Sequence, residues 1–137
     1  MTRLLAFILI AGLIVACKNE ELLKGDGLYG KWEATSFASL ESMSYPKKEG
    51  YSPIITFMKD GKYELKLDVN SCNGNYLILA RNIEITHPGC TKICCDSDFS
   101  KKFVALLSRV SSFTIERNHN LYLYINDWGF IILDKIE

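Results

Sequence analysis

The stretch PIITFMKDGKYELKLDV at residues 53–69 decides the fold class of this chain. Two apolar-rich runs, 53–58 and 63–69, flank the turn sequence KDGK at 59–62. An Asp-Gly pair between two such runs is a strong β-hairpin signal, because it accepts the positive φ angles of a tight turn. The second run alternates apolar Tyr63, Leu65 and Leu67 with charged neighbours, as a strand with one buried face does. The stretch therefore predicts an antiparallel hairpin.

Further strands are predicted on both sides of this hairpin, at 28–37, 76–80, 83–86, 112–116, 121–125 and 130–135. The segment 70–75, NSCNGN, is dense in turn formers and predicts a turn. Asp96, Ser97 and Asp98 supply an N-cap and negative charge for one amphipathic helix over about 97–110. Its apolar stripe comprises Phe99, Phe103, Leu106, Leu107 and Val110.

The predicted fold class is mainly β (α+β). We expect a curved antiparallel β-sheet or barrel-like meander of about eight strands, with the amphipathic helix inserted after strand five. The sheet either closes as a barrel or wraps around the helix. The apolar stripe is then core rather than a cofactor site.

The N-terminal run LLAFILIAGLIVAC at 4–17 has the parts of a secretory signal, with Arg3 before it and small residues at its end. Ile14-Val15-Ala16-Cys17 resembles the lipobox of bacterial lipoproteins, in which the cysteine is acylated and becomes the first residue. An uncleaved anchor is the alternative, but a bilayer-spanning helix needs about 20 apolar residues. We predict a signal peptide at 1–16, a lipidated tether at 17–27 and one domain at 28–137, with lipid on Cys17.

The residues after Cys17 bear on location. Lys18 stands where an aspartate would resemble the inner-membrane retention signal. The short acidic run Glu20-Glu21 resembles the surface-export signal of Bacteroidetes-type lipoproteins, although a solvated tether has the same composition. We expect an outer-membrane lipoprotein, either periplasmic or surface-exposed, whose membrane contact is the anchor at Cys17.

The charge balance is even, with 16 basic and 16 acidic residues in the whole chain. No basic run is present, so nucleic-acid binding has no electrostatic support. No repeats or low-complexity segments are present, and we expect a monomeric domain.

Four cysteines lie beyond Cys17, namely Cys72, Cys90, Cys94 and Cys95. An even number in an exported domain predicts two disulfides, for which three connectivities exist. A bond between the neighbours Cys94 and Cys95 would close a strained ring, so we expect Cys72 to pair with Cys94 or Cys95. A metal site that includes His87 is the alternative. The cysteine spacing and the oxidising compartment disfavour it, so no metal is predicted.

The order of these elements resembles the META-domain family of small heat-shock-type bacterial lipoproteins. The resemblance covers most of 28–136 and rests on Leu28-x-Gly30-x-Trp32, Phe57-x-x-Asp60-Gly61, Cys72-Asn73 with Tyr76, Thr91-Lys92-Ile93-x-Cys95, Phe103-x-x-x-Leu107, Leu121-Tyr122-Leu123 and Gly129. Three departures are the short spacing from Cys72 to Tyr76, Ser71 in place of glycine, and the additional Cys90 and Cys94. The resemblance implies an eight-stranded β architecture with a helix, in envelope lipoproteins linked to stress or drug tolerance. It implies no catalytic residues.

The Gly30-x-Trp32 opening is also similar to lipocalin-like proteins, whose tryptophan packs across one end of a ligand-binding barrel. Ordinary core packing of Trp32 is the alternative and is favoured, because buried aromatic residues dominate small cores.

Motifs for catalysis are absent from the sequence. His87 and His119 have no motif partner, and no nucleophile elbow or phosphate loop occurs. We predict no enzyme and no cofactor. The first functional hypothesis is an envelope module that binds a protein or glycan, with a filled interior and exposed aromatic residues such as Tyr45, Tyr51 and Trp128. The second is a carrier of a small apolar ligand, with an open cavity near Trp32.

Overall fold

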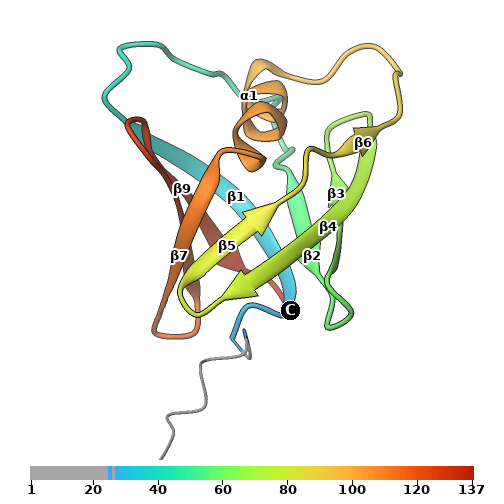
Figure 1. Ribbon diagram of the computed structural model, residues 1–137. Coiled ribbons are helices and arrows are strands. Elements are labelled where there is room, and N and C mark those ends of the chain that lie inside the picture. The colour runs from blue at the N-terminus through green and yellow to red at the C-terminus, as the bar shows by residue number, and fades with distance from the viewer. Residues whose placement is uncertain (1–24, 26) are drawn as a thin grey trace, which may run out of the picture.

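The computed structural model describes residues 25 and 27–137 and contains nine strands and one helix in that part of the chain (Figure 1). The strands are β1 (Gly30–Ser39), β2 (Ile54–Phe57), β3 (Lys62–Lys66), β4 (Ser71–Leu79), β5 (Asn82–Ile85), β6 (Gly89–Cys90), β7 (Val110–Glu116), β8 (Asn120–Ile125) and β9 (Gly129–Lys135). The helix α1 (Asp98–Leu107) lies between β6 and β7.

Eight of the strands close into an antiparallel barrel. Their order is β3-β2-β1-β9-β8-β7-β5-β4, and β4 pairs with β3 to complete the ring. The two-residue β6 pairs with β4 outside this ring. The mainly β fold with about eight antiparallel strands is thus confirmed, and of the two predicted forms the closed barrel is the one observed.

The hairpin predicted at 53–69 is present as β2 and β3. Ile54 pairs with Lys66 and Phe57 with Tyr63 across it. Tyr63 and Leu65 point into the core, while the charged residues that alternate with them, Lys62, Glu64 and Lys66, are exposed. Gly61 has φ +81° in the turn, a conformation that a side chain would strain.

The turn predicted at 70–75 is wrong, because these residues begin the long strand β4. Each of the residues 71–75 has a Cα partner on β3, from Lys66 opposite Ser71 to Lys62 opposite Asn75. Gly74 allows the Tyr63 ring to lie directly against the strand, where a Cβ would be only 2.6 Å from the Tyr63 hydroxyl. Pairing with a neighbouring strand overrides the local turn preference.

The helix begins as predicted at the N-cap Ser97, whose side chain accepts a hydrogen bond from the Ser100 amide. It ends at Leu107 rather than near residue 110, because Val110 already pairs with Ile125 in the sheet. It also follows a sixth strand, β6, in the segment that the sequence left irregular. The stripe Phe99, Phe103, Leu106 and Leu107 is buried.

The core fills the barrel interior, and α1 lies across its upper opening (Figure 1). Trp32 is 0% exposed and donates from Nε1 to the Leu28 carbonyl oxygen at 2.7 Å. No surface of its ring is left for a ligand, so Trp32 is a core residue. The inward side chains of β8 and β9, namely Leu121, Leu123, Ile131 and Leu133, are also 0% exposed.

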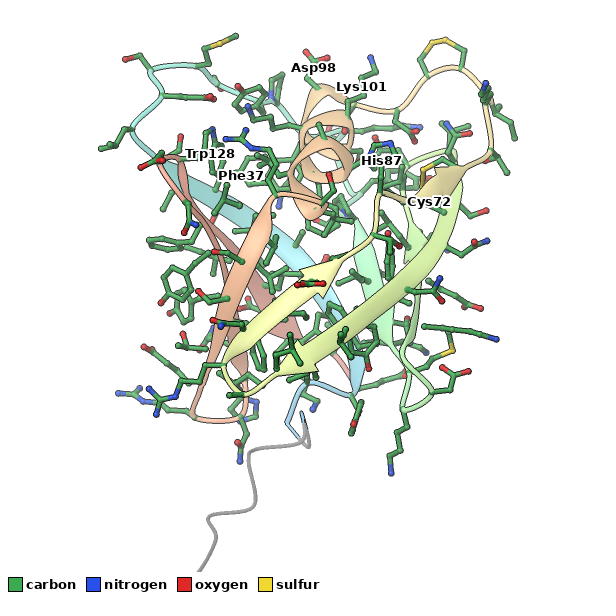
Figure 2. All side chains as sticks on the ribbon, in the orientation of Figure 1. Phe37, Cys72, His87, Asp98, Lys101 and Trp128 are labelled. Carbon is green, nitrogen blue, oxygen red and sulfur yellow. A yellow bond between two sulfur atoms is a disulfide. The ribbon has the colours of Figure 1, made fainter. Side chains whose placement is uncertain are left out.

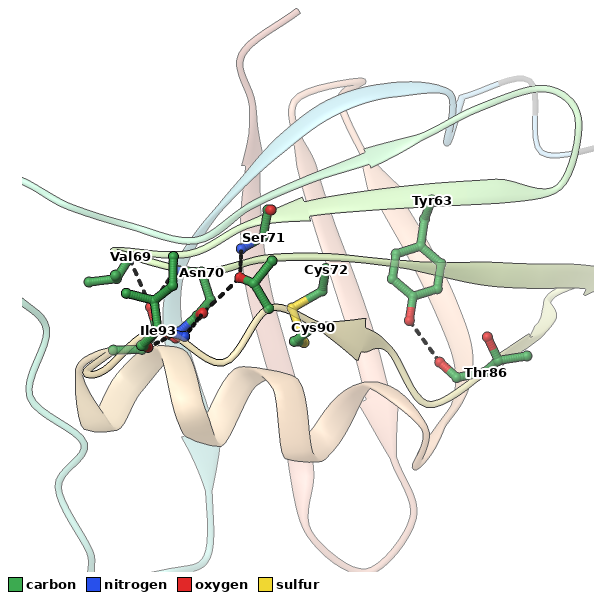
Figure 3. The surroundings of a disulfide bond; sticks show 10 residues. Tyr63, Val69, Asn70, Ser71, Cys72, Thr86, Cys90 and Ile93 are labelled. Atoms are coloured by element: carbon green, nitrogen blue, oxygen red, sulfur yellow. Dashed lines mark hydrogen bonds between the residues drawn. A yellow bond between two sulfur atoms is a disulfide. The ribbon is translucent and has the colours of Figure 1, made fainter.

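The cysteines pair differently from the sequence-based expectation. Cys72 is bonded to Cys90, because the pairing of β6 with β4 makes these two residues Cα partners (Figure 3). The expected bond from Cys72 to Cys94 or Cys95 is therefore wrong. The disfavoured pair Cys94–Cys95 is joined in the structure.

The barrel has two distinct ends. At the capped end lie α1, the β1–β2 loop (residues 40–53) and the cysteine loop (residues 86–97) (Figure 1). At the basal end lie the turns β2–β3, β4–β5 and β7–β8, together with residues 25 and 27–29 and the C-terminal Glu137. Cys17 and the predicted signal peptide lie outside the described residues. In the described part of the chain, the one helix is too short to cross a membrane.

Candidate functional site

An aromatic cluster lies at the capped end, beneath the β1–β2 loop. Phe37 of β1 stacks on Phe99 of α1, with ring centroids 4.3 Å apart and planes 16° apart. Tyr45 from the loop and Trp128 from the β8–β9 turn meet Phe37 edge-on, at 6.0 and 5.8 Å. Figure 2 shows Phe37 and Trp128 next to each other beside the helix. Four separate elements are thus joined by one set of rings.

Two lysines lie over these rings. Lys102 Nζ of α1 is 4.7 Å from the centroid of Tyr45 and 5.1 Å from that of Trp128. Lys47 Nζ is 4.5 Å from the centroid of Phe99 and donates to the Ala34 carbonyl oxygen at 3.1 Å. Cation–π contacts of this kind contribute about 0.5–1 kcal/mol when exposed. They fasten the β1–β2 loop to the barrel.

Glu41 connects the loop to the helix. Its carboxylate accepts from the Tyr45 hydroxyl at 2.6 Å and from Lys102 Nζ at 3.1 Å. These two donors hold the pKa of Glu41 below its ordinary value. Burial works against the charge on Lys102, but its contacts with Tyr45 and Glu41 outweigh burial and raise the pKa of Lys102. Both groups are therefore charged at neutral pH.

A shallow surface pocket of about 430 Å³ lies between this cluster and the loop. Hydroxyl groups of Thr35, Ser36, Ser39 and Ser44 line it together with Phe37, Tyr45, Phe99, Glu41, Met43 and Lys47. Burial lowers the pKa of Lys47, although the charges of Glu33 and Asp134 oppose the shift. The lining combines hydrogen-bonding groups with aromatic faces, which suits a polar ligand that also has apolar surface.

Trp128, which packs against Phe37, has an unpaired donor. The residue is 5% exposed, and its Nε1 is buried without a hydrogen-bond partner among the described residues. It lies near enough to Glu41 to help lower the pKa of that carboxyl, but not in hydrogen-bonding geometry. A buried donor without an acceptor costs about 1–3 kcal/mol.

The aromatic residues predicted to be exposed differ in their exposure. Tyr51 is 50% exposed, Tyr45 is half-buried and Trp128 is buried. The expectation for Trp128 is thus wrong, because its ring packs edge-on against Phe37. The exposed apolar side chains of this loop are instead Leu40, at 96%, and Met43, at 69%.

The cysteine loop at the same end is organised by the buried side chain of Asn70 (Figure 3). Asn70 Nδ2 donates to the Ile93 carbonyl oxygen and to Asp96 Oδ2, both at 2.6 Å. Its Oδ1 accepts from the Thr91 hydroxyl and the Ile93 amide, both at 2.7 Å. Ile93 itself is 58% exposed. One buried side chain thus holds an exposed apolar residue in place.

Asp68 connects the β3–β4 turn to the start of α1. Its carboxylate accepts from the Ser97 amide at 2.5 Å and from the Ser100 hydroxyl at 2.9 Å. Burial raises the pKa of Asp68, but the hydrogen bonds from Ser97 and Ser100 outweigh burial and lower it overall. An anion at a helix N-terminus is also favoured by the helix dipole.

Replacing Asp68 by asparagine is expected to lower the free energy of unfolding at pH 7 by about 1 kcal/mol, through weaker hydrogen bonds to the helix start. A carboxyl with a lowered folded-state pKa stabilises the fold above its unfolded pKa, near 3.9, and loses this effect as pH falls through the folded value. The difference between wild type and Asp68→Asn should therefore shrink as pH falls below about 4 and vanish below the lowered folded-state pKa. Urea unfolding of both proteins across pH 2–7 measures this difference in the free energy of unfolding. A difference that stays constant with pH would contradict the stabilising role of the ionised Asp68.

The candidate histidines do not come together. His87 is exposed in the loop after β5, and His119 is exposed in the β7–β8 turn. Within residues 25 and 27–137, no three His, Cys, Asp or Glu side chains gather as metal ligands would.

Sequence reasoning missed the residues that organise the capped end, namely Glu41, Lys47, Lys102 and Asn70. Glu41 and Lys102 are 61 residues apart, so no local pattern relates them. Asn70 stands in a run of turn formers, which hides its structural role.

The fold and this surface define a small antiparallel barrel with a filled interior and a loop-rich capped end, an architecture suited to a binding module. The family profile of the META domain matches residues 26–130, and the chain belongs to the META domain family. The resemblance drawn from the sequence is thereby confirmed.

Two solved structures share the fold. A protein from Burkholderia xenovorans, solved by NMR, has a TM-score of 0.64 and 10% identity, covering 78% of this chain and 81% of that one. A DUF4847 family protein from Bacteroides vulgatus ATCC 8482, solved by crystallography, has a TM-score of 0.58 and 14% identity, covering 82% of this chain and 96% of that one. No curated protein matches the sequence.

Proposed function

We propose that this chain is a non-catalytic, lipid-anchored binding module of the bacterial cell envelope. Lipid on Cys17 holds it at the outer membrane, in the periplasm or on the cell surface, and its capped end binds a protein or glycan. The observation that carries the proposal is the filled interior. Phe103, Leu107 and the inward residues of the strands leave the barrel no room for a ligand, so recognition uses the outer surface.

The capped end is the part of that surface best suited to a partner. Leu40, Met43 and Tyr51 are exposed on one loop, beside hydroxyl groups and Lys47. Interfaces combine an apolar centre with a polar rim, and tyrosine is enriched in them. The loop is also fastened by Glu41 and Lys47, so little conformational entropy is lost on binding.

The alternative function, a lipocalin-like carrier of a small apolar ligand, has less support. It needs an open cavity beside Trp32, whereas this ring is 0% exposed and hydrogen-bonded to Leu28. The family resemblance suggests envelope stress or drug tolerance as the setting in which the module acts.

Site-specific photo-crosslinking in intact cells tests the proposal. A benzophenone amino acid at Met43 is expected to give a discrete cross-linked product, because residue 43 is 69% exposed at the proposed contact surface. The same amino acid at Glu64, exposed on the barrel wall at β3, is the matched control and is expected to give none. Replacing Leu40 by serine should weaken the product at residue 43.

Two results would overturn this function. Equal products at residues 43 and 64 would mean that the capped end has no special role. A small molecule that remains bound to residues 18–137 in native mass spectrometry, and leaves on denaturation, would favour the carrier. Acylation of Cys17 is measured separately by labelling cells with an alkyne fatty acid, with Cys17→Ala as the control.

A further inference from the structure

The outer face of β4 changes character along its length. At the capped end its outward residues are Ser71, Asn73 and Asn75, which are polar and exposed. Toward the basal end they are Leu77 and Leu79, which remain 54% and 51% exposed. Outward positions of a barrel in water are normally polar, as on the neighbouring β3. The two leucines therefore mark a surface at which the strand meets something other than water.

The two leucines lie at the end of β4 near which the chain enters the barrel. A Cβ on Gly25 would clash with the side chain of Ile78, which points to the inner face of β4 between the two outward leucines. Gly25, Ala80, Arg81 and Ile115 line one pocket of about 410 Å³ at the same end. The N-terminal segment thus joins the domain directly beside the β4–β5 turn.

Two arginines lie in the turns at this end of the barrel. Arg81 in the β4–β5 turn and Arg117 in the β7–β8 turn are exposed, and no ion pair to either is present among the described residues. Of the acidic groups at this end, Asp60 is paired with Lys62 at 3.8 Å. Glu116 at the end of β7 and Glu84, the exposed Cα partner of Leu77 on β5, have no ion pair among the described residues. Exposed leucines beside unpaired arginines match an interface of acyl chains and anionic phosphates.

We propose that this basal patch, defined as Leu77, Leu79, Arg81 and Arg117, rests on the surface of an anionic phospholipid bilayer. The inference depends on the lipid anchor at Cys17 of the proposed function. From Cys17 to Gly25 the chain spans eight residues, at most about 28 Å when fully extended. The anchor therefore holds the basal end close to the headgroups and turns the capped end toward the opposite side.

Tryptophan scanning with brominated phospholipid tests the contact, because the native Trp32 and Trp128 are buried and add little quenching. Residues 18–137 carry an N-terminal hexahistidine tag bound to nickel-chelating lipid in phosphatidylethanolamine–phosphatidylglycerol vesicles. The tag replaces the acyl anchor, so the contact is measured whether or not Cys17 is acylated in cells. The variants are Leu77→Trp, Leu79→Trp and, as the matched control at the capped end, Leu40→Trp.

Brominated lipid is expected to quench the tryptophans at 77 and 79 and to leave the one at 40 unchanged. Equal quenching at all three positions, or none at 77 and 79, overturns the proposal. Shielding of residues 77 and 79 from aqueous iodide without vesicles also overturns it, because residues 18–24 or a second copy would then cover the patch.

The charged part of the patch has its own readout. Replacing Arg81 and Arg117 by glutamine is expected to weaken binding of the untagged protein to the same vesicles by about fivefold per arginine. Lys92→Gln, an exposed change at the capped end, is the control and should have no effect. Equal losses from the arginine and lysine variants would overturn the assigned orientation. Acylation of Cys17 is measured separately by fatty-acid labelling, so a failed anchor is distinguished from a failed contact.

Discussion

Replacing Phe103 by alanine is expected to lower the free energy of unfolding by about 3–5 kcal/mol. Phe103 is 0% exposed and stands in the middle of α1, on the stripe that faces the barrel interior. Removing its ring leaves a cavity that the surrounding rigid strands cannot close, and this adds to the lost burial. Thermal and urea unfolding of the variant measure the effect.

The same variant tests whether the wild-type interior is filled. An apolar cavity of this kind stays dry and binds molecules such as benzene. Benzene should therefore raise the melting temperature of Phe103→Ala and leave that of the wild type unchanged. Lys101→Ala, an exposed change on the same helix, is expected to alter stability by less than about 0.5 kcal/mol. Equal stabilisation of the wild type by benzene would reveal an open cavity and favour the carrier function.

Replacing Asn70 by alanine is expected to destabilise the protein by about 3 kcal/mol. The change removes four hydrogen bonds of 2.6–2.7 Å and leaves the amide and carbonyl of Ile93 without this partner. It should also loosen the cysteine loop, because Asn70 connects Thr91, Ile93 and Asp96. Hydrogen exchange at the Ile93 amide measures this local effect, and urea unfolding measures the global one.

Asn73→Ala is the matched control for this prediction. Asn73 lies on the same strand but is exposed, and its side chain makes no hydrogen bond to another described residue. We expect its replacement to change stability by less than about 0.5 kcal/mol. If Asn70→Ala and Asn73→Ala have the same free energy of unfolding, the hydrogen bonds of the Asn70 side chain do not stabilise the fold.

The two proposals together predict how the domain is oriented relative to the membrane. Apolar side chains of the β1–β2 loop are exposed at one end, and Leu77 and Leu79 are exposed near the other. In the proposed arrangement the basal end rests on the membrane, and the β1–β2 loop, the proposed partner surface, faces away from it. The helix has a structural role, since it fills the upper opening and supports the loop through Phe99 and Lys102.

Local patterns predicted the elements that depend on neighbouring residues. The Asp60-Gly61 hairpin, the N-cap at Ser97 and the apolar stripe of α1 are all present where the sequence indicated them. Where a distant partner decides the conformation, local reasoning was wrong. Residues 71–75 form a strand because β3 pairs with them, and Cys72 meets Cys90 because β6 lies beside β4.

The sequence by itself determined the mainly β fold class, the single capped helix and the family resemblance, because periodicity, turn residues and caps act over a few positions. Only the tertiary structure decided the closure of the barrel, the disulfide partners, the burial of Trp128 and the assembly of Glu41, Lys102 and Asn70 with their partners. These features join residues from different strands and loops. Their distances are set by strand register and barrel closure, which no local stretch of sequence encodes.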